Sequence, residues 1–99
     1  MAIPLKIRAI CTFGVGTSVM LVNNIKKVLG KHNIKADVDA VTLIEAEGLQ
    51  CDIVITEPSF QYLLNKVKCR KAITLSNFSD LNELEGKLLA TLRELGVLT

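Results

Sequence analysis

The chain has 99 residues, 49% of them apolar, and 12 Lys and Arg residues against 10 Asp and Glu residues leave a net charge of +2. This length and composition predict one domain spanning residues 1–99, with a core that needs neither a disulfide nor a metal. The mild, scattered charge argues against a nucleic-acid partner. The lack of a signal-peptide core and of any membrane-length apolar run predicts a reduced, soluble, cytoplasmic protein.

Four strands are predicted along the chain. Residues 5–11 are rich in Leu, Ile and Ala, carry Lys6 and Arg8 in their first half and are expected to become buried toward Cys11. Residues 34–40 alternate apolar and polar side chains before Val41 breaks the pattern, as in a strand with one solvent-exposed face. Residues 51–56 are continuously apolar at their centre, which is typical of a central parallel strand, and residues 72–75 give the fourth strand. The second strand therefore belongs at an edge of the sheet and the third inside it.

Helical patterns separate these strands. After Ser18 an apolar stripe recurs at helical spacing as far as the expected cap at Gly30. The stripe consists of Leu21, Ile25, Val28 and Leu29. Thr42 and Glu45 have the form of a capping box for a helix of one or two turns, which Gly48 can end.

The second half of the chain predicts two further helices. Pro58 suits the first turn of a helix that covers Ser59 to about Val67. Ser79 can cap the last helix, with Asp80 at its positive end. The apolar stripes of these helices are Phe60, Leu63, Leu64 and Val67 in one and Leu81, Leu84, Leu88, Leu92 and Leu95 in the other.

Strands that alternate with helices at short spacing predict an α/β fold. We expect a Rossmann-like three-layer sandwich with a four-stranded parallel sheet in the order 2-1-3-4. Its topological switch point lies at the carboxyl ends of the first and third strands, where ligands bind. The segment from Cys11 to Ser18 occupies that place.

This segment places a cysteine and a glycine-containing loop before a helix. Gly14 and Gly16 let the backbone curl so that its N–H groups point at one spot, and the helix adds the positive end of its dipole. The same field favours the thiolate form of Cys11, which would be the nucleophile toward a bound phosphate. The predicted phosphate-binding residues are Thr12, Phe13, Gly14, Val15, Gly16, Thr17 and Ser18.

The spacing of this loop separates it from other phosphate-binding loops. It has no lysine, as a nucleotide-binding loop would, and it lacks the third glycine of a dinucleotide fingerprint. Its shape is closer to the loop of the low-molecular-weight tyrosine phosphatases, which have an arginine where this chain has Thr17. Because arginine stabilises the transferring phosphoryl group, its absence favours a phosphoryl carrier over a hydrolase.

From Cys11 to Ser18 the sequence resembles the IIB component of the bacterial sugar phosphotransferase system, in its ascorbate and galactitol group. The loop of that group is typically Cys-Gly-x-Gly-x-Gly-Thr/Ser-Ser, from which this chain departs at Thr12, and the segment Leu75-Ser76-Asn77-Phe78 favours the ascorbate branch. The resemblance implies that Cys11 takes a phosphoryl group from a phosphohistidine of a IIA partner. It also implies transfer to a carbohydrate held by a membrane IIC permease. Nothing in the sequence requires a metal, a nucleotide or another cofactor.

Two other functions stay open on the sequence. One is a small phosphatase-like hydrolase, for which Asp80 is the candidate general acid; the other is a non-catalytic regulatory module that senses phosphate through the loop. Phe13 and Val15 fit the core or a docking collar around Cys11 equally well, whereas Met20 is expected to be buried.

The remaining cysteines and the histidine have plainer expectations. Cys51 and Cys69 begin strands, away from the ligand-binding end, and are expected to pack as small apolar residues. The odd number of cysteines and the lack of a Cys-x-x-Cys pair disfavour a disulfide scaffold or a zinc site. His32 is expected at the surface.

Overall fold

The structure, a computed structural model, describes residues 5–10, 15–76 and 80–96, and within them it confirms the predicted α/β sandwich. The described residues form a four-stranded parallel sheet in the order β2-β1-β3-β4, so β2 and β4 are its edges. The strands are β1 (Leu5–Ile10), β2 (Ala36–Val41), β3 (Gln50–Thr56) and β4 (Lys68–Thr74).

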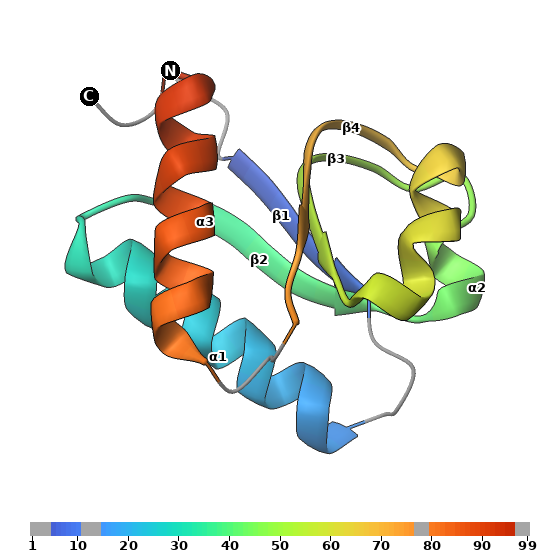
Figure 1. The fold of residues 1–99 in the computed structure, drawn as a ribbon, viewed down its shortest axis with the longest axis horizontal. Helices are drawn as coiled ribbons and strands as arrows, with labels where there is room; N and C mark the ends of the chain where they lie inside the picture. Colours follow the sequence, from blue (N-terminus) through green and yellow to red (C-terminus); the bar gives the residue numbers. More distant parts are fainter. Residues whose placement is uncertain (1–4, 11–14, 77–79, 97–99) are drawn as a thin grey trace.

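Helices cover both faces of this sheet (Figure 1). On one face, α1 (Val15–Lys31) and α3 (Leu81–Glu94) share the larger apolar cluster with the strands. On the other face, α2 (Leu43–Ala46) and the 3-10 helix η1 (Pro58–Lys66) form a second cluster. Among the described helices, none has the length and apolar character needed to cross a membrane.

The apolar stripes predicted for the helices form most of this core. Their buried members are Leu21, Ile25, Val28, Leu29, Phe60, Leu63, Val67, Leu84, Leu88 and Leu92. Leu64 and Leu95 are partly buried at the borders of the clusters. Leu81, the first member of the predicted stripe of α3, is 44% exposed and lies outside the core.

Helix α1 is longer than predicted at both ends. Residues 15–18, expected in the loop, form its first turn, and Gly30, expected as its cap, lies inside the helix. The left-handed residue that ends the helix is Asn33, with a φ of 57°. The N–H groups of Asn33 and Ile34 donate to the carbonyls of Gly30 (3.2 Å) and Leu29 (2.9 Å), the paired bonds that commonly close a helix.

The later helices also differ from the prediction. η1 is a 3-10 helix with a non-helical backbone at Phe60 (φ −110°, ψ 15°), although Pro58 stands in its first turn as predicted. The three-residue spacing of the buried Phe60 and Leu63 suits the tighter 3-10 turn. The N-cap of α3 is Asp80, whereas Ser79, the predicted cap, lies outside the described residues.

The capping box before α2 is confirmed. The N–H of Glu45 donates to the Thr42 hydroxyl and the N–H of Thr42 donates to the Glu45 carboxylate, each at 3.2 Å. Gly48 follows with a φ of 81°, and its N–H donates to the carbonyl of Lys66 at 3.1 Å. A side chain at Gly48 would strain this left-handed backbone.

Glu85 connects α3 to the end of α1, and a pH-dependent stability follows from it. Its Oε2 accepts a hydrogen bond from Lys31 Nζ at 3.1 Å and lies 3.4 Å from the ring of the partly exposed His32, and these contacts lower the pKa of Glu85. A lowered folded-state pKa stabilises the protein above the unfolded-state pKa, and this contribution is lost as pH falls through the folded-state value. Glu85→Gln should therefore lower the free energy of unfolding at neutral pH.

The difference between the Glu85→Gln variant and the wild type should disappear in acid, as urea titrations at several pH values would measure. Glu94→Gln, which removes the carboxylate 3.0 Å from Lys71, is the surface control. A Glu85→Gln difference that stayed constant down to acid pH would contradict the assignment.

Candidate functional site

The predicted site lies at the carboxyl edge of the sheet, where β1 ends beside β3 (Figure 1). The chain leaves β1 through α1 for β2 on one side and then returns through α2 to β3 on the other, so the carboxyl end of β1 is the switch point. Ile10, the last residue of β1, is fully buried. The residues that follow it, Cys11, Thr12, Phe13 and Gly14, lie outside the described residues.

The first turn of α1 brings backbone donors to this edge. The first four N–H groups of an α-helix have no partner within the helix, and in α1 they belong to residues 15–18. This turn contains no acidic side chain that would offset the positive end of the helix dipole. An anion at this end of α1 would therefore meet N–H donors that the helix itself does not use and a favourable field. The side chains of residues 15–18 are outside the description, including the hydroxyls of Thr17 and Ser18.

Thr56 joins the end of β3 to the end of β1. Its side chain is fully buried, and its hydroxyl donates to the carbonyl of Ile10 at 3.4 Å. Its own carbonyl accepts a hydrogen bond from the N–H of Leu75 at 2.9 Å. The residue that precedes Cys11 is thus tied to the neighbouring strand. Thr56 was not singled out by the sequence analysis. The signal that could have identified it is a polar residue at the end of an otherwise apolar strand.

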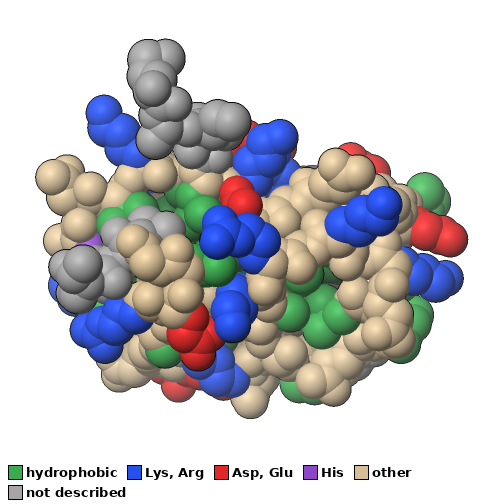
Figure 2. Space-filling view, turned by 90° about the horizontal axis from the view of Figure 1, so that it is seen from above, with side chains coloured by type: hydrophobic (Ala, Val, Ile, Leu, Met, Phe, Trp, Pro, Cys, Tyr) green, Lys and Arg blue, Asp and Glu red, His purple; other side chains and the backbone are tan. Residues whose placement is uncertain are grey.

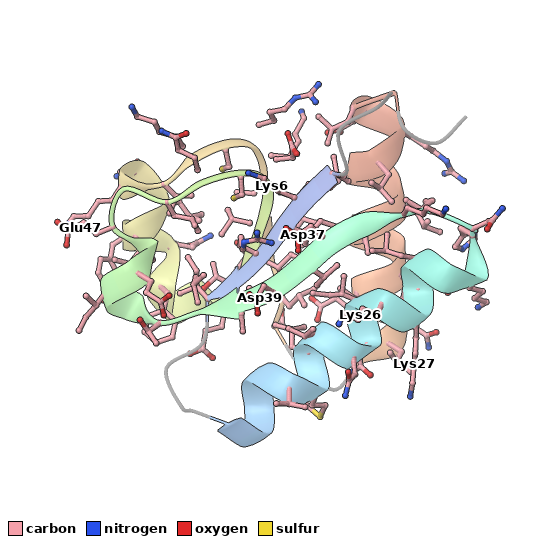
Figure 3. The ribbon with its side chains drawn as sticks, turned by 180° about the vertical axis from the view of Figure 1, so that it is seen from behind. Lys6, Lys26, Lys27, Asp37, Asp39 and Glu47 are labelled. Atoms are coloured by element: carbon pink, nitrogen blue, oxygen red, sulfur yellow. The ribbon has the colours of Figure 1, made fainter. Side chains whose placement is uncertain are left out.

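Two apolar side chains are exposed where α1 begins. Val19 is 51% exposed and Met20 is 37% exposed, so the expected burial of Met20 is wrong. The exposed side chains farther along the same helix are polar or basic and belong to Asn23, Lys26, Lys27 and Lys31. Figure 3 labels Lys26 and Lys27 among them. The exposed strip of α1 therefore changes from apolar beside the site to basic away from it.

The three arginines of the sequence lie away from the carboxyl edge. Arg8 of β1 reaches toward the amino end of β2, where Nη1 donates to the Asp37 carbonyl at 2.8 Å and Nη2 to its carboxylate at 3.0 Å. Arg70, near the amino end of β4, lies 3.9 Å from Asp52, and Arg93 lies in the last turn of α3. Figure 2 shows the opposite edge, where basic side chains are interspersed with acidic ones.

The other candidate residues have structural contacts. Asp80, the candidate general acid, caps α3 by accepting hydrogen bonds at Oδ1 from the N–H groups of Asn82 (3.0 Å) and Glu83 (3.1 Å). Cys51 and Cys69 are free thiols that pack at the border of the second apolar cluster. Over the ranges that the structure describes, no group of three or more His, Cys, Asp or Glu residues could hold a metal ion.

Comparison with known proteins identifies a family that the chain matches. A family model described as the lactose/cellobiose-specific IIB subunit of the PTS system matches residues 6–89, which include the whole segment from Cys11 to Ser18. No curated protein matches the chain. The description supports a IIB subunit, but it does not support the ascorbate and galactitol group to which the loop was compared.

Proposed function

The chain belongs to the family of IIB subunits of the sugar phosphotransferase system and is a phosphoryl carrier of that system, and we propose that Cys11 carries the phosphoryl group. In this proposal the donor is a phosphohistidine on a IIA partner and the acceptor is a carbohydrate bound by a membrane IIC permease. In this proposal the 99 residues act as one cytoplasmic domain. The domain is brought to the inner membrane by its contact with IIC.

The succession of β1, Cys11 and α1 is the observation that most supports this assignment. β1 ends at the buried Ile10, at the switch point of the sheet, and Cys11 is the next residue. The N–H groups of residues 15–18, which have no acceptor within the helix, follow within the same segment. A nucleophile placed beside such backbone donors can receive a group that carries negative charge on its oxygens.

The proposed reaction is an in-line displacement at phosphorus. The thiolate sulfur of Cys11 attacks, an S–P bond forms as the P–N bond to the donor histidine breaks, and the leaving imidazole nitrogen takes up a proton. The N–H groups at the start of α1 stabilise the charge on the phosphoryl oxygens. A sugar hydroxyl then attacks the same phosphorus and releases its proton to solvent, while the S–P bond breaks and the thiolate returns.

The positions of the arginines and of Asp80 favour a carrier over a hydrolase. A phosphatase of the similar fold needs an arginine on the phosphoryl group, and the arginines of this chain lie toward the other edge of the sheet. The Asp80 carboxylate is engaged as the cap of α3. The phosphoenzyme would therefore wait for a second partner instead of reacting with water.

Transfer from a IIA protein charged with radiolabelled phosphate on its histidine tests this proposal. A label that stays on the chain, resists acid and maps to Cys11 is the expected result, since phosphohistidine is acid-labile. Rapid release of inorganic phosphate would instead indicate a hydrolase. A chain that stays unlabelled with every IIA protein tried would exclude both the phosphoryl carrier and the hydrolase. The non-catalytic, phosphate-sensing regulatory module would then be the remaining function.

We propose that the sugar is ascorbate or a related carbohydrate, because the sequence of the segment Leu75–Phe78 resembles the ascorbate branch. Within it, the N–H of Ser76 donates to the Glu83 carboxylate at 3.1 Å, while Asn77 and Phe78 lie outside the described residues. The family description names lactose and cellobiose instead. Vesicles that contain the ascorbate, galactitol, lactose or cellobiose IIC permease, mixed with the phosphorylated chain, would identify the sugar that receives the label.

We propose that Val19 and Met20 form part of the docking surface for IIA. Met20→Asp should raise the apparent KM for phosphorylated IIA about tenfold, because a charge would replace an apolar contact at the interface, and should leave the maximal rate unchanged. Tyr62→Asp, at a 61% exposed apolar position on η1, is the matched control. Equal KM values for the Met20 variant and the wild type would exclude this surface.

Thr56 is proposed to position the end of β1 for the reaction. Thr56→Val removes the hydroxyl that donates to Ile10 and should lower both the free energy of unfolding, by about 1 kcal/mol, and the maximal rate of transfer. Thr74→Val is the control, because Thr74 is the register partner of Thr56 on β4 and the same change of side chain is made there. If the two variants lost transfer to the same extent, the bond to Ile10 would have no special role.

A further inference from the structure

Cys51 and Cys69 lie opposite each other on neighbouring strands. Cys51 of β3 and Cys69 of β4 are register partners in a parallel pairing, so their side chains leave the sheet on the same side. Both pack against the same apolar cluster. Neighbouring strands run about 4.8 Å apart, and disulfides join residues whose Cα atoms are about 4.4–6.8 Å apart. The two thiols therefore meet the backbone requirement for a disulfide.

The pair is far from the phosphoryl site. Ile7 is the register partner of Ile53, so Cys51 lies level with the first residue of β1, whereas Ile10 ends that strand at the carboxyl edge. Five residues of strand separate these levels, a distance of about 17 Å. The two cysteines can thus react with each other without involving the site at the end of β1.

The surroundings keep both thiols protonated at neutral pH. Burial, followed by the neighbouring Cys69, raises the pKa of Cys51 to about 11, and burial raises the pKa of Cys69. Arg8 on β1 lowers the pKa of Cys51, whereas Asp52 on β3 raises it. Arg70 on β4 lies beside Asp52. Both side chains remain partly exposed, so a small oxidant can reach them.

We propose that Cys51 and Cys69 are a redox pair that hydrogen peroxide converts into a reversible intramolecular disulfide between β3 and β4. One sulfur attacks hydrogen peroxide, the O–O bond breaks, and water leaves to give a sulfenic acid. The second sulfur attacks the first, the S–S bond forms, and the sulfenic oxygen leaves as water with the proton of the second thiol. Two thiols are oxidised, one peroxide is reduced to two waters, and a dithiol reductant reverses the bond.

The disulfide would close the segment that contains η1. Because it restricts the unfolded chain between Cys51 and Cys69, the oxidised form should unfold at a temperature about 5 °C or more above that of the reduced form. The reaction should be slow near neutral pH and faster at mildly alkaline pH, where more thiolate is present. The inference does not depend on the proposed role of Cys11.

The test treats a Cys11→Ser variant with hydrogen peroxide and measures intact mass, peptide linkage and thermal unfolding. A monomer that loses the mass of two hydrogens, contains a Cys51–Cys69 crosslinked peptide and returns to its original mass with dithiothreitol is the expected result. Peptide mapping of the oxidised wild type provides the same readout if the variant does not fold. Adding Cys51→Ser or Cys69→Ser should replace the disulfide by oxygen adducts on the remaining thiol. Oxygen adducts on both thiols without a crosslink, intermolecular dimers alone, or no reaction even at alkaline pH would overturn the proposal.

Discussion

A Cys11→Ser variant should lose phosphoryl transfer by roughly 10³-fold or more. A serine hydroxyl is almost entirely protonated near neutral pH, and nothing in the described surroundings supplies a base for it, whereas a thiolate attacks phosphorus directly. Removal of a covalent nucleophile typically costs several orders of magnitude in rate. The variant should keep its circular dichroism spectrum and its unfolding midpoint, because the exchange replaces one sulfur atom by oxygen and the described core clusters are formed by other residues.

Cys51→Ser and Cys69→Ser are the matched controls for this experiment. Both replace a thiol by a hydroxyl, and both lie toward the amino ends of their strands, away from the proposed site. They should transfer phosphate at the wild-type rate per folded molecule. If Cys11→Ser transferred phosphate normally and one of the controls did not, Cys11 would not be the nucleophile.

The order of the sheet was predictable because its signals are local. The alternation in residues 36–41 predicts a strand with one wet face, and β2 is an edge strand. The apolar centre of β3 predicts a covered strand, and β3 lies inside the sheet. Thr42 and Glu45 specify their capping box within four residues, so no distant contact was needed to recognise it.

The start of α1 was not predictable from the same kind of signal. Residues 15–18 include a glycine and β-branched or hydroxyl side chains, which are weak helix formers. They are helical because the next turns bury Leu21 and Ile25 against the sheet and hold the helix in place. The start of α1 changes the predicted cradle: four of its seven residues act as a helix N-terminus and not as a loop.

The contacts around the site depend on strand register, which the sequence does not state. Thr56 meets Ile10 only because β3 lies beside β1 with its last residue level with the end of that strand. Arg8 could have pointed to either end of β1, and it turns toward Asp37 of β2. The sequence pattern therefore predicts the segment around Cys11, while the contact of Thr56 with the end of β1 came from the folded sheet.

Leu88→Ala should have the largest effect on stability among these variants. Leu88 is fully buried in the cluster that joins α1 and α3 to the sheet. Truncating a buried leucine to alanine removes apolar contacts and leaves a cavity, which costs about 3 kcal/mol. That loss is a large fraction of the roughly 5–15 kcal/mol by which a domain of this size is stable. Urea denaturation should show a lower midpoint with an unchanged slope.

Leu81→Ala provides the control, because Leu81 belongs to the same helix but is 44% exposed, and its loss should cost well under 1 kcal/mol. Both residues lie on α3, whereas the proposed nucleophile follows β1, so transfer per folded molecule should be unchanged in both variants. Cys11→Ser should show the reverse, with stability kept and transfer lost. A Leu88→Ala variant that was stable but inactive would mean that packing of α3 against α1 sets the geometry of the site, and that the start of α1 is positioned from the core.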